Sequence, residues 1–131
     1  MDKYVIVLMN GEKVATTGVN LSAVATIFNS NNTIAAKIGK KSMAKHLVSA
    51  IVKMEALNKT VDRNVTIKVG ETPLFTSTTD PDKLLESLTS DINKKAFVMV
   101  NDEILINRSV YQYAEVDEEQ NTEETETQAG A

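Results

Sequence analysis

The chain has 131 residues, no cysteine, a single histidine and a formal net charge of −4. This length is enough for one ordinary domain with a buried core. The lack of cysteine excludes disulfides, thiolate metal sites and thiol nucleophiles, so nothing in the composition demands an oxidising compartment.

The charge is unevenly distributed along the chain. Residues 115–131 contain seven carboxylates and no basic residue, whereas residues 1–114 carry a net charge of +3. The acidic segment also lacks hydrophobic periodicity, which is typical of disorder. We therefore expect one α+β domain over residues 1–114 and a disordered acidic tail over residues 115–131.

The N-terminal run from residue 4 to residue 9 is apolar at every position, which predicts a strand covered on both faces. Asn10-Gly11 follows, and this dipeptide is the strongest short-range signal for a hairpin with a type I′ turn. Six apolar residues are too few for a signal-peptide core or a membrane span. The expected location is the cytoplasm, which would be the host cytoplasm for a phage-encoded protein.

Two short segments have the apolar spacing of amphipathic helices. The first follows Asn20 or Ser22 as its cap and places Leu21, Val24, Ile27 and Phe28 at helical spacing. In the second, Asp80 is the cap and Pro81 the first helical residue, a combination that favours a helix start.

A longer helix is expected from Met43 to Asn58, with Ser42 as its cap. Its apolar stripe is formed by positions 43, 47, 51 and 54. The lysines of this region then lie beside or opposite the stripe.

Two further hairpins are expected, one over residues 64–78 with its turn at Gly70 and one over residues 96–116 with its turn at Asn101-Asp102. The predicted fold class is α+β: an antiparallel sheet of about six strands in three hairpins, packed against about three helices. The three hairpin units resemble one another in layout, but no residue-level repeat is visible.

The residues needed for catalysis are largely missing. His46 is the only histidine and has no carboxylate near it in sequence, and no Gly-x-Ser-x-Gly motif occurs. Asp80 and Asp82 are explained by a helix cap and a helix N-terminus. Gly39–Ser42 lacks the first glycine of a phosphate-binding loop. We therefore expect no catalytic residue, no metal site, no cofactor and no enzyme.

The leading functional expectation is a protein-binding or assembly module that binds a protein partner or itself, such as an accessory protein of a phage or mobile element. Helices over one face of a six-stranded sheet leave the other face for a subunit interface. The candidate interface residues are apolar and lie on the first and third hairpins: Val5, Val7, Met9, Val98 and Val100.

The alternative is binding of nucleic acid. The expected helix region carries five lysines that could contact phosphates, and two tyrosines near the C-terminus could stack on bases. These candidate residues are Lys37, Lys40, Lys41, Lys45, Lys53, Tyr111 and Tyr113. A basic body with an acidic tail also resembles single-stranded-DNA-binding proteins in layout, and the tail would regulate binding. The solvated face of a soluble helix is the favoured explanation of the lysines, because surface charge of this density is usual in soluble domains.

Overall fold

The computed structural model describes residues 2–117 of the chain. They form ten strands, two α-helices and three short 3-10 helices. The strands are β1 (Lys3–Leu8), β2 (Lys13–Thr17), β3 (Ala35–Ile38), β4 (Lys41–Ala44), β5 (Val48–Lys53), β6 (Val65–Val69), β7 (Thr72–Thr76), β8 (Phe97–Val100), β9 (Ile104–Asn107) and β10 (Tyr111–Val116). The helices are α1 (Leu21–Phe28) and α2 (Pro81–Ile92), and the 3-10 helices are η1 (Lys45–Leu47), η2 (Met54–Leu57) and η3 (Arg108–Val110).

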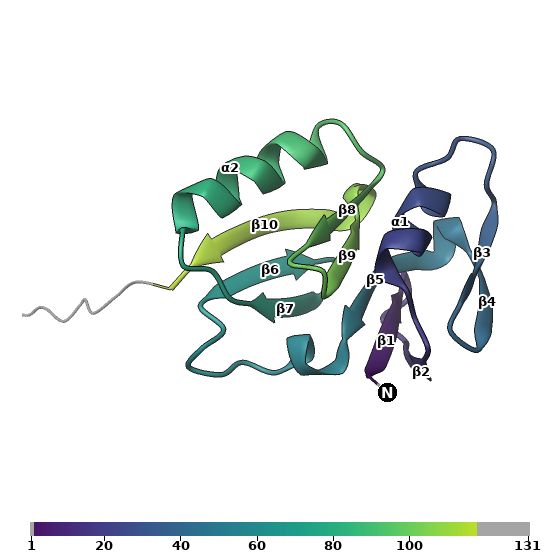
Figure 1. Ribbon diagram of the computed structural model, residues 1–131, viewed down its shortest axis with the longest axis horizontal. Helices are drawn as coiled ribbons and strands as arrows, with labels where there is room; N and C mark the ends of the chain where they lie inside the picture. Colours follow the sequence, from purple (N-terminus) through teal and green to yellow (C-terminus); the bar gives the residue numbers. More distant parts are fainter. Residues whose placement is uncertain (1, 118–131) are drawn as a thin grey trace, which may run out of the picture.

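The strands form three antiparallel sheets (Figure 1). The largest has the strand order β2-β1-β5-β9-β8, the second has the order β10-β6-β7, and β3 pairs only with β4 in the described residues. The predicted α+β class with antiparallel pairing is confirmed. The predicted six strands and three helices are wrong, because residues 2–117 contain ten strands and only two α-helices.

The five-stranded sheet is the central layer. One face packs against α1 and the β3–β4 hairpin, and the other packs against α2 and the three-stranded sheet (Figure 1). Alternate residues of β1 enter the two cores: Tyr4 and Ile6 face α1, whereas Val5 and Val7 face the second sheet. A strand covered on both faces is apolar on both, which explains the apolar run from Tyr4 to Leu8 in β1.

The helix predicted from Met43 to Asn58 is absent. This segment contains the end of β4, then η1, β5 and η2. β5 lies between β1 and β9, and its first five residues are buried. Because both faces of β5 are covered, four of its six residues are apolar, and their spacing matches that of a helix by coincidence. Ser42 lies within β4 and caps no helix.

The two shorter helices are confirmed together with their caps. Asn20 Oδ1 accepts a hydrogen bond from Ala23 N at 3.1 Å, and Asp80 Oδ1 accepts one from Lys83 N at 3.2 Å. These bonds satisfy backbone donors that have no partner inside the first turn. Pro81 is the first residue of α2, where its fixed φ suits a helix start.

The three predicted hairpin turns are present, with one difference in geometry. Asn101 and Asp102 both have positive φ, at 53° and 55°, as a tight two-residue turn requires. In the first hairpin only Gly11 has positive φ, and Asn10 Oδ1 instead accepts a hydrogen bond from Glu12 N at 2.9 Å. The predicted type I′ turn at Asn10-Gly11 is therefore wrong, because a side-chain bond stabilises a longer loop there.

The structure contains the same unit twice, which no residue-level repeat in the sequence indicates. The first unit (residues 3–53) and the second unit (residues 65–116) both run hairpin, helix, hairpin, 3-10 helix, strand. In each unit the last strand pairs antiparallel with the first, β5 with β1 and β10 with β6. Each last strand also carries one extra residue that breaks the register, Ser49 in β5 and Gln112 in β10.

Backbone hydrogen bonds recur at the equivalent positions of the two units. The equivalent pairs are Met9 N to Leu47 O and Gly70 N to Val110 O, both at 2.8 Å, and Lys45 N to Ile34 O at 2.7 Å and Arg108 N to Ala96 O at 2.9 Å. Identical strand order, register break and loop bonds make the second unit a structural repeat of the first.

The two units differ in the side chains on one sheet face, which the second unit covers in the first unit and nothing in the described residues covers to the same extent in the second. Val5 and Val7 of β1 are buried beneath the second unit, whereas Thr66 and Lys68 hold the same positions in β6 and are half-buried. Apolar side chains thus occupy this face only in the unit that is covered.

β10 continues to Val116, past the expected start of the acidic tail, and the rest of that tail (residues 118–131) lies outside the described residues.

Candidate functional site

The lysines predicted to bind phosphate lie on strands rather than on a helix. Three of them lie on the β3–β4 hairpin, with Lys37 on β3, Lys40 in the turn and Lys41 on β4, and Lys45 follows in η1. We call the β3–β4 hairpin together with these four lysines the basic hairpin. Lys53 lies apart, at the end of β5, with Nζ 3.6 Å from a carboxylate oxygen of Asp2.

The turn of the basic hairpin is fixed to the first sheet. Lys40 N donates to Thr16 Oγ1 at 3.0 Å, and a Cβ on Gly39 would collide with the carbonyl oxygen of Thr17. Gly39 also has a φ of +60°, which favours glycine. The backbone between the lysines is therefore held in one position against β2.

The two candidate tyrosines lie on β10, away from the basic hairpin. Tyr111 packs against the core between the five-stranded sheet and α2, whereas Met43 of β4 packs against the core on the α1 side. The basic hairpin and β10 therefore lie on opposite sides of the five-stranded sheet (Figure 1). Burial raises the pKa of the Tyr111 phenol above its ordinary value of 10.0, and Tyr113 is 46% exposed.

The candidate interface residues of the five-stranded sheet are mostly interior. Val5, Val7, Val98 and Val100 all contribute to the core beneath the second unit, and Met9 alone is exposed. The expectation of a spare sheet face assumed a single sheet. The chain's own second sheet and α2 cover that face instead.

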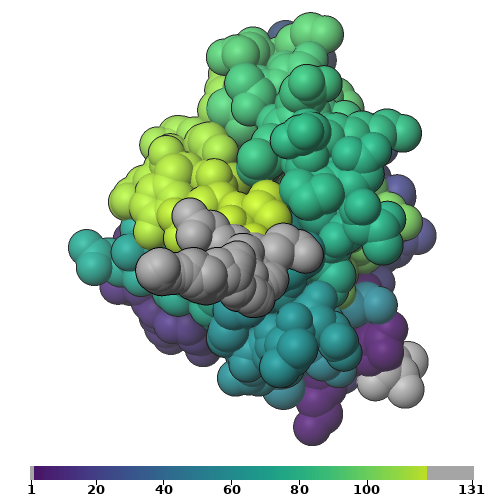
Figure 2. Space-filling model, turned by 90° about the vertical axis from the view of Figure 1, so that its left-hand side faces the viewer, coloured from purple at the N-terminus to yellow at the C-terminus, as the bar shows by residue number. Residues whose placement is uncertain are grey.

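Sequence reasoning missed the free edge of the second sheet. Within residues 2–117, β10 pairs with β6 on one side and with no strand on the other. Gln112, Tyr113 and Glu115 are exposed along it, and Figure 2 shows the yellow-green C-terminal strand at the surface beside α2. An unpaired strand presents backbone N–H and C=O groups to a partner strand. We call this feature the β10 edge. The sequence predicts β10 as part of the third hairpin, so the edge becomes visible only once β10 is assigned to a separate sheet.

The two units also differ in charge. The first unit contains seven lysines and one carboxylate, a net charge of +6, whereas the second contains eight carboxylates and five basic residues, a net charge of −3. No carboxylate occurs between Glu12 and Glu55. The basic hairpin and the β10 edge therefore lie in units of opposite charge.

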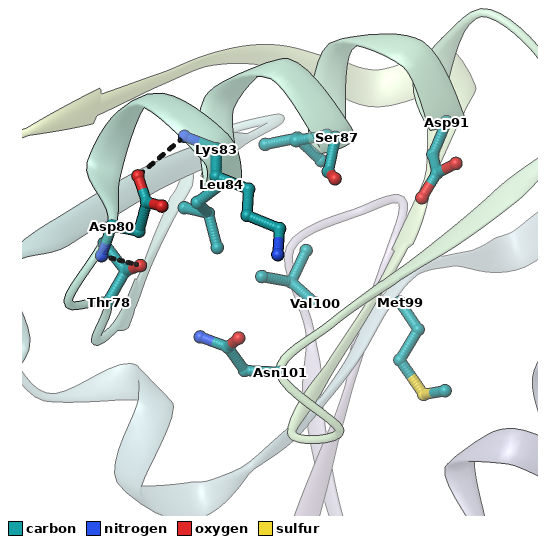
Figure 3. A pocket seen from close by; sticks show the side chains of 10 residues that line it. Thr78, Asp80, Lys83, Leu84, Ser87, Asp91, Met99, Val100 and Asn101 are labelled. Atoms are coloured by element: carbon teal, nitrogen blue, oxygen red, sulfur yellow. Dashed lines mark hydrogen bonds between the residues drawn. The ribbon is translucent and has the colours of Figure 1, made fainter.

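A hollow of about 280 Å³ lies between α2 and the β8–β9 hairpin (Figure 3). It is lined by Thr78, Asp80, Lys83, Leu84, Ser87, Leu88, Asp91, Met99, Val100 and Asn101. Asp80 caps α2, and Thr78 Oγ1 accepts a hydrogen bond from Asp80 N at 3.1 Å. These contacts stabilise the start of a helix, and among residues 2–117 no hydrogen bond joins a hydroxyl of the lining to a carboxylate.

A second polar group is a partly buried ion pair beneath the β8–β9 turn. Arg63 Nη1 lies 2.9 Å from Glu103 Oε2, and both side chains are less than one-fifth exposed. The Thr76 hydroxyl also donates to Glu103, and Asn101 Nδ2 donates to Thr76 Oγ1 at 2.9 Å. Each charged group has a partner, so the cluster fixes the turn to β7 as a structural element.

Within residues 2–117, no group of three or more His, Cys, Asp or Glu side chains could hold a metal ion. His46 is exposed in η1, and in this part of the chain it forms no ion pair with a carboxylate. No helix in the described residues is long and apolar enough to cross a membrane.

Comparisons with protein-family models, with curated proteins and with solved structures gave no match.

Proposed function

We propose that this protein is a non-enzymatic protein-binding and assembly module and that its contact surface is the β10 edge. The observation that carries the proposal is the side of β10 that pairs with no strand within residues 2–117, where Tyr113 and Glu115 are exposed. A partner strand gains backbone hydrogen bonds at such an edge, and exposed side chains give specificity. A half-exposed tyrosine is also a side chain that protein interfaces favour.

The inventory of polar groups supports a binding role over catalysis. Thr78 and Asp80 of the hollow beneath α2 stabilise a helix start, and Asp91 pairs with the Lys95 ammonium at 3.9 Å. The partly buried ion pair beneath the β8–β9 turn has all its partners. An active site instead needs a nucleophile or base that is free to meet a substrate.

A photo-cross-linking residue in place of Tyr113 tests the proposal in cells that express the natural gene. We expect a covalent adduct whose mass is that of this chain plus a second protein chain. The matched control is the same residue in place of Val61, which is 96% exposed and lies outside β10. Equal adduct yields at both positions, or no protein adduct at Tyr113, would contradict the proposal.

Nucleic-acid binding is the second candidate, and the basic hairpin favours it. Its lysines line one hairpin without a carboxylate between them. Labelled single- and double-stranded DNA should then bind the full chain with a steep salt dependence. Replacing Lys37, Lys40 and Lys41 by alanine should lower the slope of log affinity against log salt by about 2–3, since each phosphate contact contributes about 0.9. No binding at low salt would exclude this candidate.

A further inference from the structure

Equivalent strands of the two units have different pairing partners, and this difference indicates what binds at the β10 edge. In the first unit the edge of β5 is paired with β9, so the β8–β9 hairpin of the second unit extends the sheet of the first. β10 is the strand of the second unit that corresponds to β5, and β4 is the strand of the first unit that corresponds to β9. In the described residues, both β10 and β4 have one unpaired side.

We propose that β4 of one molecule pairs antiparallel with the β10 edge of a second copy of this chain. The contact repeats between molecules the pairing that β5 and β9 make within one molecule. This inference rests on the protein-binding function proposed above and names the partner as the chain itself.

The internal repeat fixes the register of the contact. Within the molecule Ile104, Leu105 and Ile106 lie opposite Val52, Ile51 and Ala50. The equivalent residues place Lys41 opposite Glu115, Ser42 opposite Ala114 and Met43 opposite Tyr113. An ammonium then faces a carboxylate, and a thioether faces an aromatic ring, and both are favourable cross-strand pairs.

The pairing must occur between molecules. The basic hairpin and β10 pack on opposite sides of the five-stranded sheet, so β4 cannot reach β10 of its own chain (Figure 1). Each copy therefore offers one β4 and accepts one β4 at a different site. Contacts of this heterologous kind produce closed rings or open filaments.

The charge of the two units favours this arrangement over other contacts between copies. A first unit of charge +6 meets a second unit of charge −3, whereas contact between two first units or two second units brings like charges together. Opposite potentials accelerate encounter and disfavour wrong pairings.

The intermolecular contact differs from its internal counterpart in what it buries. At β5 and β9 all six paired residues are buried apolar side chains, whereas Lys41, Ser42 and Glu115 are exposed in the single molecule. With less apolar area to remove from water, association is weaker than the internal contact and depends on protein concentration.

Cysteine trapping tests the register directly, because the chain has no cysteine of its own. Met43→Cys is made in one full chain and Tyr113→Cys in a second full chain that carries a mass tag. The two are mixed at low salt and oxidised. The control mixes Met43→Cys with Val61→Cys, whose cysteine replaces a side chain that is 96% exposed and lies outside β10. Lys41→Cys with Glu115→Cys repeats the test at two exposed positions, in case Met43→Cys disturbs the core on the α1 side.

We expect at least about tenfold more mixed disulfide from the opposed pairs than from the control, because opposed positions bring the thiols within bonding distance. Equal yields in test and control would overturn the pairing. If trapping fails while the photo-cross-linker at Tyr113 captures a different protein, the protein-binding function stands and self-pairing is overturned. If both fail, the proposed function is overturned as well.

Discussion

Thr16 and Thr76 hold equivalent positions in the two units, and each hydroxyl bonds the turn of the following hairpin. Thr16 Oγ1 accepts from Lys40 N at 3.0 Å, and Thr76 Oγ1 accepts from Asn101 Nδ2 at 2.9 Å. Both side chains are buried at the end of the second strand of their unit. This shared contact fixes each hairpin beside the sheet of its own unit. In that position the hairpin is available to pair with a strand of a different unit.

Thr76→Val should destabilise the protein more than Thr16→Val. The Thr76 hydroxyl also donates to the Glu103 carboxylate, and hydrogen bonds to charged groups are the stronger ones. We expect a loss of about 1.5–3 kcal/mol for Thr76→Val and about 0.5–1.5 kcal/mol for Thr16→Val in the free energy of unfolding, measured with urea. Equal losses would show that the bond to Glu103 adds nothing.

Arg63→Met should cost about 1–3 kcal/mol, because it leaves the Glu103 carboxylate beneath the β8–β9 turn without its cation. Lys95→Met is the matched control, since the Lys95 ammonium lies 3.9 Å from Asp91 in an exposed i,i+4 pair. Such a pair contributes about 0.5 kcal/mol or less. Similar urea midpoints for the two variants would contradict a structural role for Arg63.

Gly39→Ala should destabilise the basic hairpin more than Gly11→Ala destabilises the first hairpin. Both glycines have positive φ, which costs about 1–2 kcal/mol for other residues. A Cβ on Gly11 meets open space, whereas one on Gly39 collides with backbone of β2. The thermal midpoint of Gly39→Ala should therefore be the lower of the two. A midpoint for Gly39→Ala equal to or above that of Gly11→Ala would mean that the turn does not rest on β2.

The stability of the protein should depend on pH through Tyr111. Burial raises the pKa of its phenol in the folded state above 10.0, so the folded state binds the proton more tightly than the unfolded state. The contribution is fully present below pH 10 and is lost as pH rises through the folded-state pKa. Tyr111→Phe removes this titration, so its free energy of unfolding should fall less steeply above about pH 10. Identical alkaline profiles for variant and parent would show that Tyr111 is solvated.

Local patterns predicted the elements that depend on neighbouring residues. Asp80 and Pro81 mark the start of α2, and Asn101 with Asp102 marks a turn, because a cap and a positive φ are properties of a few adjacent residues. β5 could not be predicted in this way. Its apolar residues reflect β1 and β9 on its two sides, and these pairings depend on residues far apart in the sequence.

The candidate site was even less accessible to sequence reasoning. Val5 and Val7 have the apolar pattern of an interface, but their partner is the second unit of the same chain. The aromatic ring of Tyr113 predicts stacking on bases, whereas the structure places this residue on the side of β10 that pairs with no other strand of residues 2–117. The repeat could not be recognised from the sequence either, because strand order and register recur in the two units while the residue types differ.

Sedimentation equilibrium of the full chain and three charge variants at low salt tests whether β4 of one copy pairs with β10 of the next. If Lys41 of one copy faces Glu115 of the next, the parent chain associates as its concentration rises. Lys41→Glu and Glu115→Lys should each weaken association about fivefold, the equivalent of about 1 kcal/mol for one exposed pair. The double variant, which restores opposite charges, should recover it. A parent chain that stays monomeric throughout, or a double variant no better than either single one, would contradict the pairing of β4 with β10.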